Sequence, residues 1–182
     1  MAEKPRILTI ETLARTRLFH VQELRLRFAN GVETTYERLV GHRSGGAVLV
    51  VPMLDARTVL LIREYAAGMD RYELALPKGR IEEGEAVLEA ANRELQEEVG
   101  YAARELRLIT ALTVAPGYMG HTTQVVLAGD LYPSRMPGDE PETIEVIPWS
   151  IDRLAELTAR EDVTEARSIA ALYMVRDLLD HG

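Results

Sequence analysis

Three glutamates lie close together in a segment whose pattern predicts a helix over residues 85–99. Glu94, Glu97 and Glu98 stand at positions i, i+3 and i+4, so their carboxylates share one helix face. Two of them fall in the last predicted turn, where the helix dipole disfavours each anion by about 0.3–1 kcal/mol. A bound cation would offset this effect, and hard oxygen ligands suit Mg²⁺, with Mn²⁺ as an alternative. The face is therefore a candidate site for a divalent metal.

An acidic helix face is more often simply solvated, so the surrounding residues must decide between the two interpretations. Residues 79–101 fit the pattern G-x5-E-x7-R-E-U-x-E-E-x-G-U, where U is a bulky apolar or aromatic residue. The matching positions are Gly79, Glu85, Arg93, Glu94, Leu95, Glu97, Glu98, Gly100 and Tyr101. With Glu, Arg and Gly as frequent as in this chain, a chance match somewhere along it has odds of about one in a few hundred thousand. The spacing therefore favours a functional site.

This pattern is similar to the Nudix box, and the chain resembles the Nudix hydrolase family. Residues 61–65, 115–118 and 165–167 resemble the ADP-ribose pyrophosphatase group within that family. Pro116 follows Tyr101 by fifteen residues, a spacing that the family associates with ADP-ribose substrates. The resemblance implies Mg²⁺-dependent hydrolysis of the pyrophosphate bond in ADP-X compounds, which releases AMP. ADP-ribose, diadenosine triphosphate and NADH are such compounds.

The resemblance also assigns roles to residues in and beside the box. It implies a metal site formed by three side chains and one main-chain carbonyl: Glu94, Glu97, Glu98 and the carbonyl of Lys78. It implies that Glu85 and Arg93 form a contact that joins the helix start to the catalytic turn and orients Glu94. Residues eight apart lie a little more than two turns from each other on a helix. A surface ion pair, the alternative, demands no fixed spacing.

The general base stays open between two kinds of glutamate. In some family members a box glutamate takes this role, which here would be Glu97. In ADP-ribose pyrophosphatases a glutamate on a loop outside the box can do so. Residues 117–122 contain no carboxylate, which leaves Glu140 and Glu142, in or beside a turn-rich loop, as the outside candidates. For each of these two, a solvated loop acid is the alternative.

Arg63 and Tyr65 end a predicted strand that leads toward the box and are candidate substrate contacts. An arginine can clamp a phosphate, and a tyrosine can stack on adenine. Packing and solvation at a strand end are the alternative for both. Pro116 is a third candidate through the resemblance alone.

The elements that must position these residues predict a mixed α/β protein. Residues 1–43 are expected to form an antiparallel β-hairpin subdomain, because Asn30-Gly31 is a strong hairpin signal. By resemblance, residues 44–182 are expected to form a Nudix-type α/β/α sandwich of mixed sheets. The resemblance also implies a homodimer that forms through the hairpin.

The predicted helix of the box should bind a sheet through its own apolar stripe. Leu88, Leu95 and Val99 form this stripe, apart from the acidic face. Gly100 suits the left-handed position that follows a helix end. A second helix is expected at the end of the chain, where apolar residues recur at helical spacing.

Composition narrows the classes of function that remain. The chain has 182 residues and no cysteine, which excludes thiolate metal sites and cysteine nucleophiles. Its formal net charge of −8 disfavours nucleic acid as a partner, because such binders neutralise phosphates with basic residues. No apolar stretch reaches the roughly 18–20 residues of a membrane span, so a cytoplasmic protein is expected. The resemblance implies that its partner is a small nucleoside diphosphate substrate. The alternatives are a non-catalytic Nudix-fold nucleotide sensor and a pyrophosphohydrolase of another nucleoside diphosphate derivative.

Overall fold

The computed structural model describes residues 3–41, 46–138 and 141–181, and it divides into two compact units. Unit 1 comprises Met1–Gly46 and Thr113–Thr122, and unit 2 comprises Ala47–Leu112 and Thr123–Gly182. The predicted boundary between residues 43 and 44 lies outside the described residues and stays a prediction.

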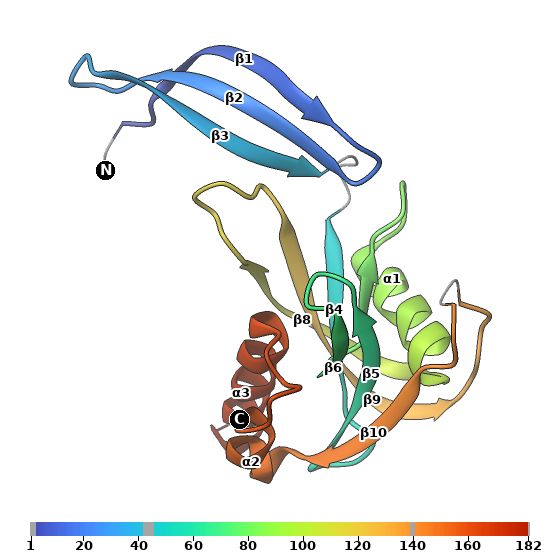
Figure 1. The fold of residues 1–182 in the computed structure, drawn as a ribbon. Helices are drawn as coiled ribbons and strands as arrows, with labels where there is room; N and C mark the ends of the chain where they lie inside the picture. Colours follow the sequence, from blue (N-terminus) through green and yellow to red (C-terminus); the bar gives the residue numbers. More distant parts are fainter. Residues whose placement is uncertain (1–2, 42–45, 139–140, 182) are drawn as a thin grey trace. The chain divides into compact units, whose positions relative to one another are not determined.

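Unit 1 contains a three-stranded antiparallel sheet in the order β1-β2-β3 (Figure 1). Its strands are β1 (Arg6–Arg15), β2 (Phe19–Arg27) and β3 (Glu33–Gly41). The predicted turn at Asn30-Gly31 joins β2 to β3, and Gly31 has a φ of 83°, which glycine adopts without strain. The antiparallel hairpin is therefore confirmed. Strand β1 adds a third strand that the hairpin signal did not indicate.

Unit 2 contains two sheets, one in the order β10-β5-β6 and one in the order β7-β4-β9-β8. The strands are β4 (Ala47–Pro52), β5 (Thr58–Ala66), β6 (Arg71–Ala75), β7 (Lys78–Arg80), β8 (Tyr101–Thr113), β9 (Thr122–Pro133) and β10 (Glu145–Ser150). The second sheet is mixed, because β4 pairs antiparallel with β7 and parallel with β9. This confirms the predicted mixed sheets.

The core of unit 2 has two halves that β4 separates. All six residues of β4 are buried, as expected for a strand that is covered on both faces. Val48 and Val50 pack in one apolar cluster, whereas Leu49 and Val51 pack in the other. Because side chains alternate across a strand, the two clusters lie on opposite faces of the sheet.

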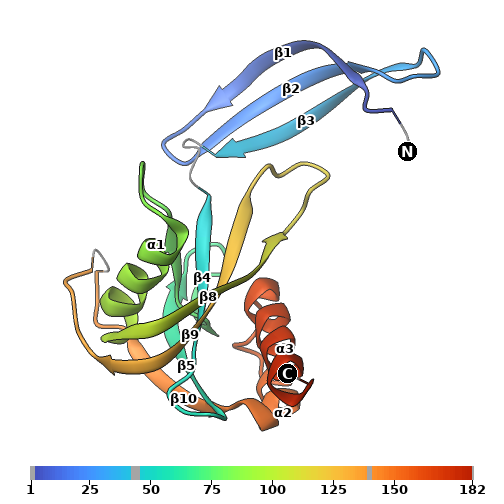
Figure 2. The same ribbon diagram turned by 180° about the vertical axis from the view of Figure 1, so that it is seen from behind.

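Helices cover both of these faces (Figures 1 and 2). Helix α1 (Val87–Glu94) continues into the π-helical turn η1 (Leu95–Val99) and contributes to the cluster of Val48. The other cluster receives η2 (Ile151–Arg153), α2 (Leu154–Thr158) and α3 (Ala166–His181). Among the described residues, no helix is both long enough and apolar enough to cross a membrane.

The buried face of the box helix differs in part from the predicted stripe. Leu95 and Val99 are buried as expected, but Leu88 is 39% exposed, so that part of the prediction was wrong. Ala90 and Ala91 are fully buried, which shows that small side chains bring the first turns of α1 close to the sheet. The π-helical turn was also unexpected, because such turns have no clear sequence signal. In it, the N–H of Gly100 donates to the carbonyl of Leu95 over 3.1 Å.

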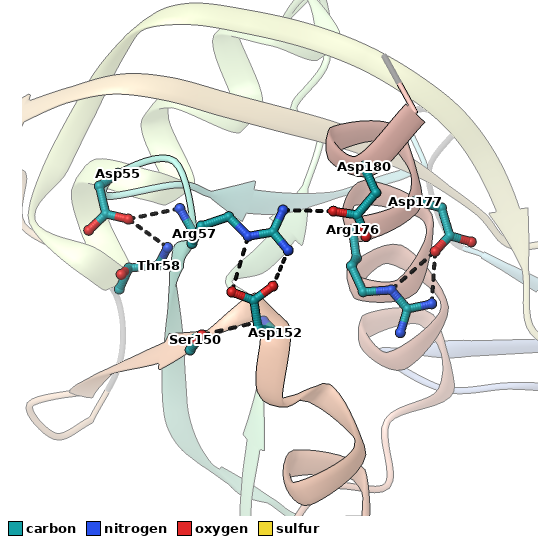
Figure 3. Close-up of polar contacts among 8 residues, drawn as sticks. All are labelled: Asp55, Arg57, Thr58, Ser150, Asp152, Arg176, Asp177 and Asp180. Atoms are coloured by element: carbon teal, nitrogen blue, oxygen red, sulfur yellow. Dashed lines mark hydrogen bonds and ion pairs between the residues drawn. The ribbon is translucent and has the colours of Figure 1, made fainter.

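A polar network holds the C-terminal helix on the strands (Figure 3). The guanidinium of Arg57, in the turn before β5, donates to the carboxylate of Asp152 in η2. It also donates to Asp180 of α3 over 2.8 Å. Asp55 accepts from the N–H groups of Arg57 and Thr58, which fixes the turn that presents this guanidinium.

Candidate active site

The candidate site is built by the strand β7, the following loop and the helix α1 with its π-helical turn. Glu89 accepts a hydrogen bond from the N–H of Ala86 over 3.2 Å and thereby caps the start of α1. Glu85 accepts from the N–H of Glu82 over 2.9 Å, which anchors its carboxylate in the loop. Gly100 has a φ of 82° and ends η1 in the left-handed conformation that the sequence predicted.

Arg93 connects the glutamates of the box. Its Nε donates to Glu85 over 2.9 Å, and its Nη1 donates to Glu94 over 2.8 Å and to Glu97 over 2.9 Å. Its Nη2 donates to Glu85 over 3.1 Å and to the carbonyl of Arg80 over 2.8 Å. These five bonds match the five N–H groups of a guanidinium. The structure therefore brings Arg93 and Glu85 together, as the resemblance implied, and uses every donor of the arginine.

Glu94 is buried against the backbone of Gly79. A Cβ placed on Gly79 would meet Oε1 of Glu94 at 2.0 Å, so a larger residue there would displace the carboxylate. Glu94 is only 7% exposed. The glycine that opens the box is thus needed for space, because its backbone conformation does not have a positive φ.

Glu98 is the most buried glutamate of the site, with 4% exposure. Its Oε2 accepts a hydrogen bond from the N–H of Lys78 over 2.9 Å. Burial raises the pKa of Glu98 to about 8, although the charge and the N–H of Lys78 oppose this shift. A buried carboxylate with this pKa gains strongly from a nearby cation, since the cation stabilises its charged form.

The donor chemistry of the site fits a hard divalent cation. Glu94, Glu97 and Glu98 offer carboxylate oxygens, and Gly79 leaves a cradle in which one of them lies. Within residues 3–41, 46–138 and 141–181, however, no three His, Asp or Glu side chains are arranged to hold a metal ion. Arg93 instead engages Glu94 and Glu97 in this arrangement. Arg93 binds one oxygen of each, Oε1 of Glu94 and Oε2 of Glu97, so metal binding would need these side chains to turn their other oxygens toward the ion.

The two candidates for the general base that the structure describes line one cavity. Glu97 and Glu142 both border a cavity of about 560 Å³, a volume suited to a small ligand. The hydroxyl of Tyr72 donates to Oε1 of Glu142 over 2.7 Å and holds this carboxylate at the rim. Glu140, the third candidate, lies outside the described residues.

The predicted substrate contacts lie in different surroundings. Arg63 donates to Glu145 over 2.9 Å and to Asp162 over 2.7 Å, so its guanidinium already holds two carboxylates. Tyr65 is 45% exposed, and its ring meets that of Tyr72 edge-on with centroids 5.6 Å apart. Tyr65 thus presents an accessible aromatic surface that could stack on a base.

Pro116 belongs to unit 1. It lies in the segment Thr113–Thr122, where the N–H of Leu39 donates to the carbonyl of Tyr118 over 2.7 Å. Pro116 therefore belongs to the same unit as the sheet β1-β2-β3.

Two residues near the site were missed by the sequence analysis. Glu64 lies 3.0 Å from Nζ of Lys78, and Tyr72 binds Glu142. Strand alternation could have placed Glu64. It follows Leu60 and Ile62 at steps of two residues, and both of these pack in the cluster that receives α1. Tyr72 had no such signal, since its contact joins residues seventy positions apart.

Comparisons with known proteins agree along nearly the whole chain. Residues 43–172 match the NUDIX domain, and residues 5–38 match the NudE-type Nudix hydrolase N-terminal domain. The ADP compounds hydrolase NudE of Escherichia coli K12 is 45% identical over 177 residues, which are 97% of this chain and 94% of that protein. An ADP-ribose pyrophosphatase of Bacillus subtilis is 29% identical over 72% of each chain. A crystal structure of an ADP compounds hydrolase superposes with a TM-score of 0.91 and 44% identity, and covers 99% of this chain and 96% of its own.

Proposed function

The chain belongs to the Nudix hydrolase family, and from this premise we propose that it hydrolyses the pyrophosphate bond of ADP-X compounds. The resemblance to the Nudix hydrolases is thereby confirmed and extends to NudE, and the α/β fold and the class of enzyme are confirmed as well. Water attacks one phosphorus and the bridging P–O bond breaks. The two products are AMP and X that carries the other phosphate. The substrates in this proposal are ADP-ribose, diadenosine triphosphate and NADH.

The observation that carries the proposal is the buried carboxylate pair of the catalytic turn. Glu94 and Glu98 are 7% and 4% exposed and lie beside β7 at the start of the box. Arg93 pairs with Glu94 over 2.8 Å, but no ion pair is formed by Glu98 within the described residues, so burial of the Glu98 carboxylate stays costly and a purely structural origin for it is unfavourable. A metal-binding role explains why the chain keeps them there.

The proposed cofactor is Mg²⁺, with Mn²⁺ as an alternative. The residues that would hold it are Glu94, Glu97, Glu98 and the carbonyl of Lys78. When bound, such an ion neutralises the charge of the pyrophosphate and lowers the pKa of a bound water. Arg93 positions the carboxylates through its bonds to Glu85 and Glu94.

For the general base we propose Glu142, with Glu97 as the alternative. Glu97 is already bound by Arg93 and belongs to the proposed metal ligands. Glu142 borders the same cavity, and its carboxylate accepts a hydrogen bond from the hydroxyl of Tyr72. In this role Oε2 of Glu142 accepts the proton of the attacking water.

Product analysis in ¹⁸O-labelled water tests the proposed function. We expect AMP from each ADP-X compound in the presence of Mg²⁺, with one ¹⁸O atom incorporated at the phosphorus that water attacks. Tight binding of ADP-ribose without products would instead favour a nucleotide sensor. Faster hydrolysis of another nucleoside diphosphate derivative would reassign the substrate.

A homodimer is part of the same proposal. Unit 1 exposes several large apolar side chains on the strands and turns of its sheet: Ile7, Ile10, Leu13, Leu18 and Phe19. A second copy of this sheet is apolar in the same way and would cover them. Light scattering coupled to gel filtration tests the dimer. The cytoplasmic location also stays a prediction, which fractionation of cells that produce the protein would test.

A further inference from the structure

Lys78 is a cation beside the acidic cluster with unused hydrogen-bond donors. An ammonium has three N–H donors, and within the described part of the chain Nζ of Lys78 has one partner, Oε2 of Glu64, at 3.0 Å. The side chain of Lys78 is 25% exposed, so solvent reaches it. Two donors therefore remain for a ligand.

Arg93 cannot supply such donors without losing its own contacts. All five of its N–H groups bind Glu85, Glu94, Glu97 or the carbonyl of Arg80. A phosphate that took one of them would release a carboxylate of the catalytic turn. The arginine of the box therefore holds the site together, and the charge of an anionic substrate needs another partner.

The backbone of Lys78 and a side chain of β5, a strand of the other sheet, both fix where the ammonium lies. Its N–H donates to the buried Glu98, so the residue is tied to the catalytic turn at its own main chain. Glu64 comes from β5 and follows Leu60 and Ile62, which pack against the α1 side of the sheet. Because side chains alternate along a strand, Glu64 lies on the face of β5 that packs with α1 and η1, and it holds the ammonium there.

We propose that the ammonium of Lys78 binds a phosphate oxygen of the substrate, and that Glu64 holds this ammonium in place. This inference rests on the proposed function and adds a substrate-binding side chain to it. A charge-assisted N–H···O bond to phosphate is stronger than a neutral one, and Lys78 keeps one donor for Glu64 while two face the ligand. The carbonyl of Lys78 and its ammonium then act separately, the first toward the metal and the second toward the nucleotide.

The test compares neutral and charged side chains at position 78, because each variant keeps the main-chain carbonyl and N–H. Lys78→Met and Lys78→Gln remove the charge, Lys78→Arg keeps it, and Arg176→Met removes an exposed charge on α3 as a control (Figure 3). The measurements are KM and kcat for ADP-ribose, the melting temperature, and the Kd of α,β-methylene ADP-ribose. This analogue cannot be hydrolysed at its bridge, so its Kd reports binding alone.

We expect both neutral variants to raise KM and Kd about 10- to 100-fold, as the loss of a hydrogen bond to a charged group predicts. Lys78→Arg should stay within about threefold of the wild type, and the melting temperatures should agree within about 3 °C. Unchanged KM and Kd in both neutral variants would overturn the proposal. Glu64→Gln tests whether the Glu64–Lys78 pair has only a structural role. If Glu64→Gln and Lys78→Met weaken binding equally and lower the melting temperature equally, the pair is structural and the proposal is overturned.

The wild type separates this inference from the proposed function. If it hydrolyses no ADP-X compound but binds the analogue in a Lys78-dependent way, the proposed function fails and the phosphate contact stands. If it hydrolyses ADP-ribose and the neutral variants do so with wild-type KM, the phosphate contact fails and the proposed function stands.

Discussion

The carboxylate of Glu94 lies so close to the backbone of Gly79 that a Cβ there would meet Oε1 at 2.0 Å. This contact connects the first residue of the box to a glutamate on the helix that follows it. The carboxylate is the far end of a flexible side chain, so it can move when the space is filled. A larger residue at position 79 should therefore displace the carboxylate of Glu94 while changing the stability of the fold only slightly.

Gly79→Ala should lower kcat/KM for ADP-ribose about 100-fold, because a displacement of about 1 Å at a catalytic group has effects of this size. The melting temperature should fall only slightly, since Glu94 can turn away without moving the backbone. Gly68→Ala is the matched control, because a Cβ at Gly68 meets nothing within 4 Å and Gly68 has no positive φ. Equal activities of the two variants would contradict this account of Gly79.

Arg93→Lys should lower kcat at least about 10-fold and destabilise the protein by about 1–3 kcal/mol. Lysine has three donors at one point, so it cannot reach the acceptors that the planar guanidinium of Arg93 joins. Urea unfolding and steady-state kinetics measure the two effects. Arg176→Lys on the exposed face of α3 should change neither quantity. Wild-type kcat in Arg93→Lys would mean that Arg93 does not position the catalytic turn.

Asp162 provides a test of stability against pH. Hydrogen bonds from Arg160 and Arg63 hold the pKa of Asp162 well below its usual value of 3.8. Burial acts in the opposite direction but does not outweigh them. A carboxylate whose folded pKa is depressed stabilises the protein above the unfolded pKa, and this contribution is lost as pH falls toward the folded pKa. Asp162→Asn should therefore lower the free energy of unfolding by about 1–3 kcal/mol at pH 7.

The difference between the wild type and Asp162→Asn should shrink as pH falls below about 4, because the unfolded wild type then takes up a proton. Unfolding by urea at pH 7, 5 and 3 measures this change. The control is Asp177→Asn, which affects an exposed pair on α3. A difference for Asp162→Asn that stays constant over this range would contradict the depressed pKa.

Glu142→Gln should lower kcat by about 100-fold or more with little change in KM, since a general base contributes about 10²–10⁴-fold. Tyr72→Phe removes the hydroxyl that holds Glu142 and should lower kcat by a smaller factor. Both rates are measured at saturating Mg²⁺. Full activity of Glu142→Gln, together with loss of activity in Glu97→Gln, would transfer the role to Glu97.

Local patterns predicted the parts of this protein that depend on nearby residues. The resemblance of the box implied a contact between Glu85 and Arg93 that the structure contains, and Asn30-Gly31 predicted the hairpin of unit 1. The exposure of Leu88 and the π-helical turn after Glu94 were not predictable in this way, because both depend on how α1 meets the sheet.

Contacts between elements that lie apart in the sequence were not predictable from local patterns. Glu64 meets Lys78 only because β5 and β7 come together in the fold. Tyr72 of β6 reaches Glu142, which lies in the bend before β10. The contacts of Arg63 were not predictable either, since its partners Glu145 and Asp162 lie more than eighty residues away in the sequence.

Glu98→Gln tests most directly the claim that the buried carboxylates serve a metal-dependent hydrolysis. Glutamine can still accept the hydrogen bond from the N–H of Lys78, and a neutral amide is easier to bury than a carboxylate, so the variant should fold. The matched control is Glu89→Gln, which keeps a capping side chain on the same helix.

The decisive measurement is the rate of AMP release from ADP-ribose at saturating Mg²⁺ for the wild type and these two variants. We expect a loss of about 10³-fold or more in Glu98→Gln, an unchanged rate in Glu89→Gln, and similar melting temperatures for all three proteins. Wild-type turnover in a folded Glu98→Gln protein would contradict this expectation.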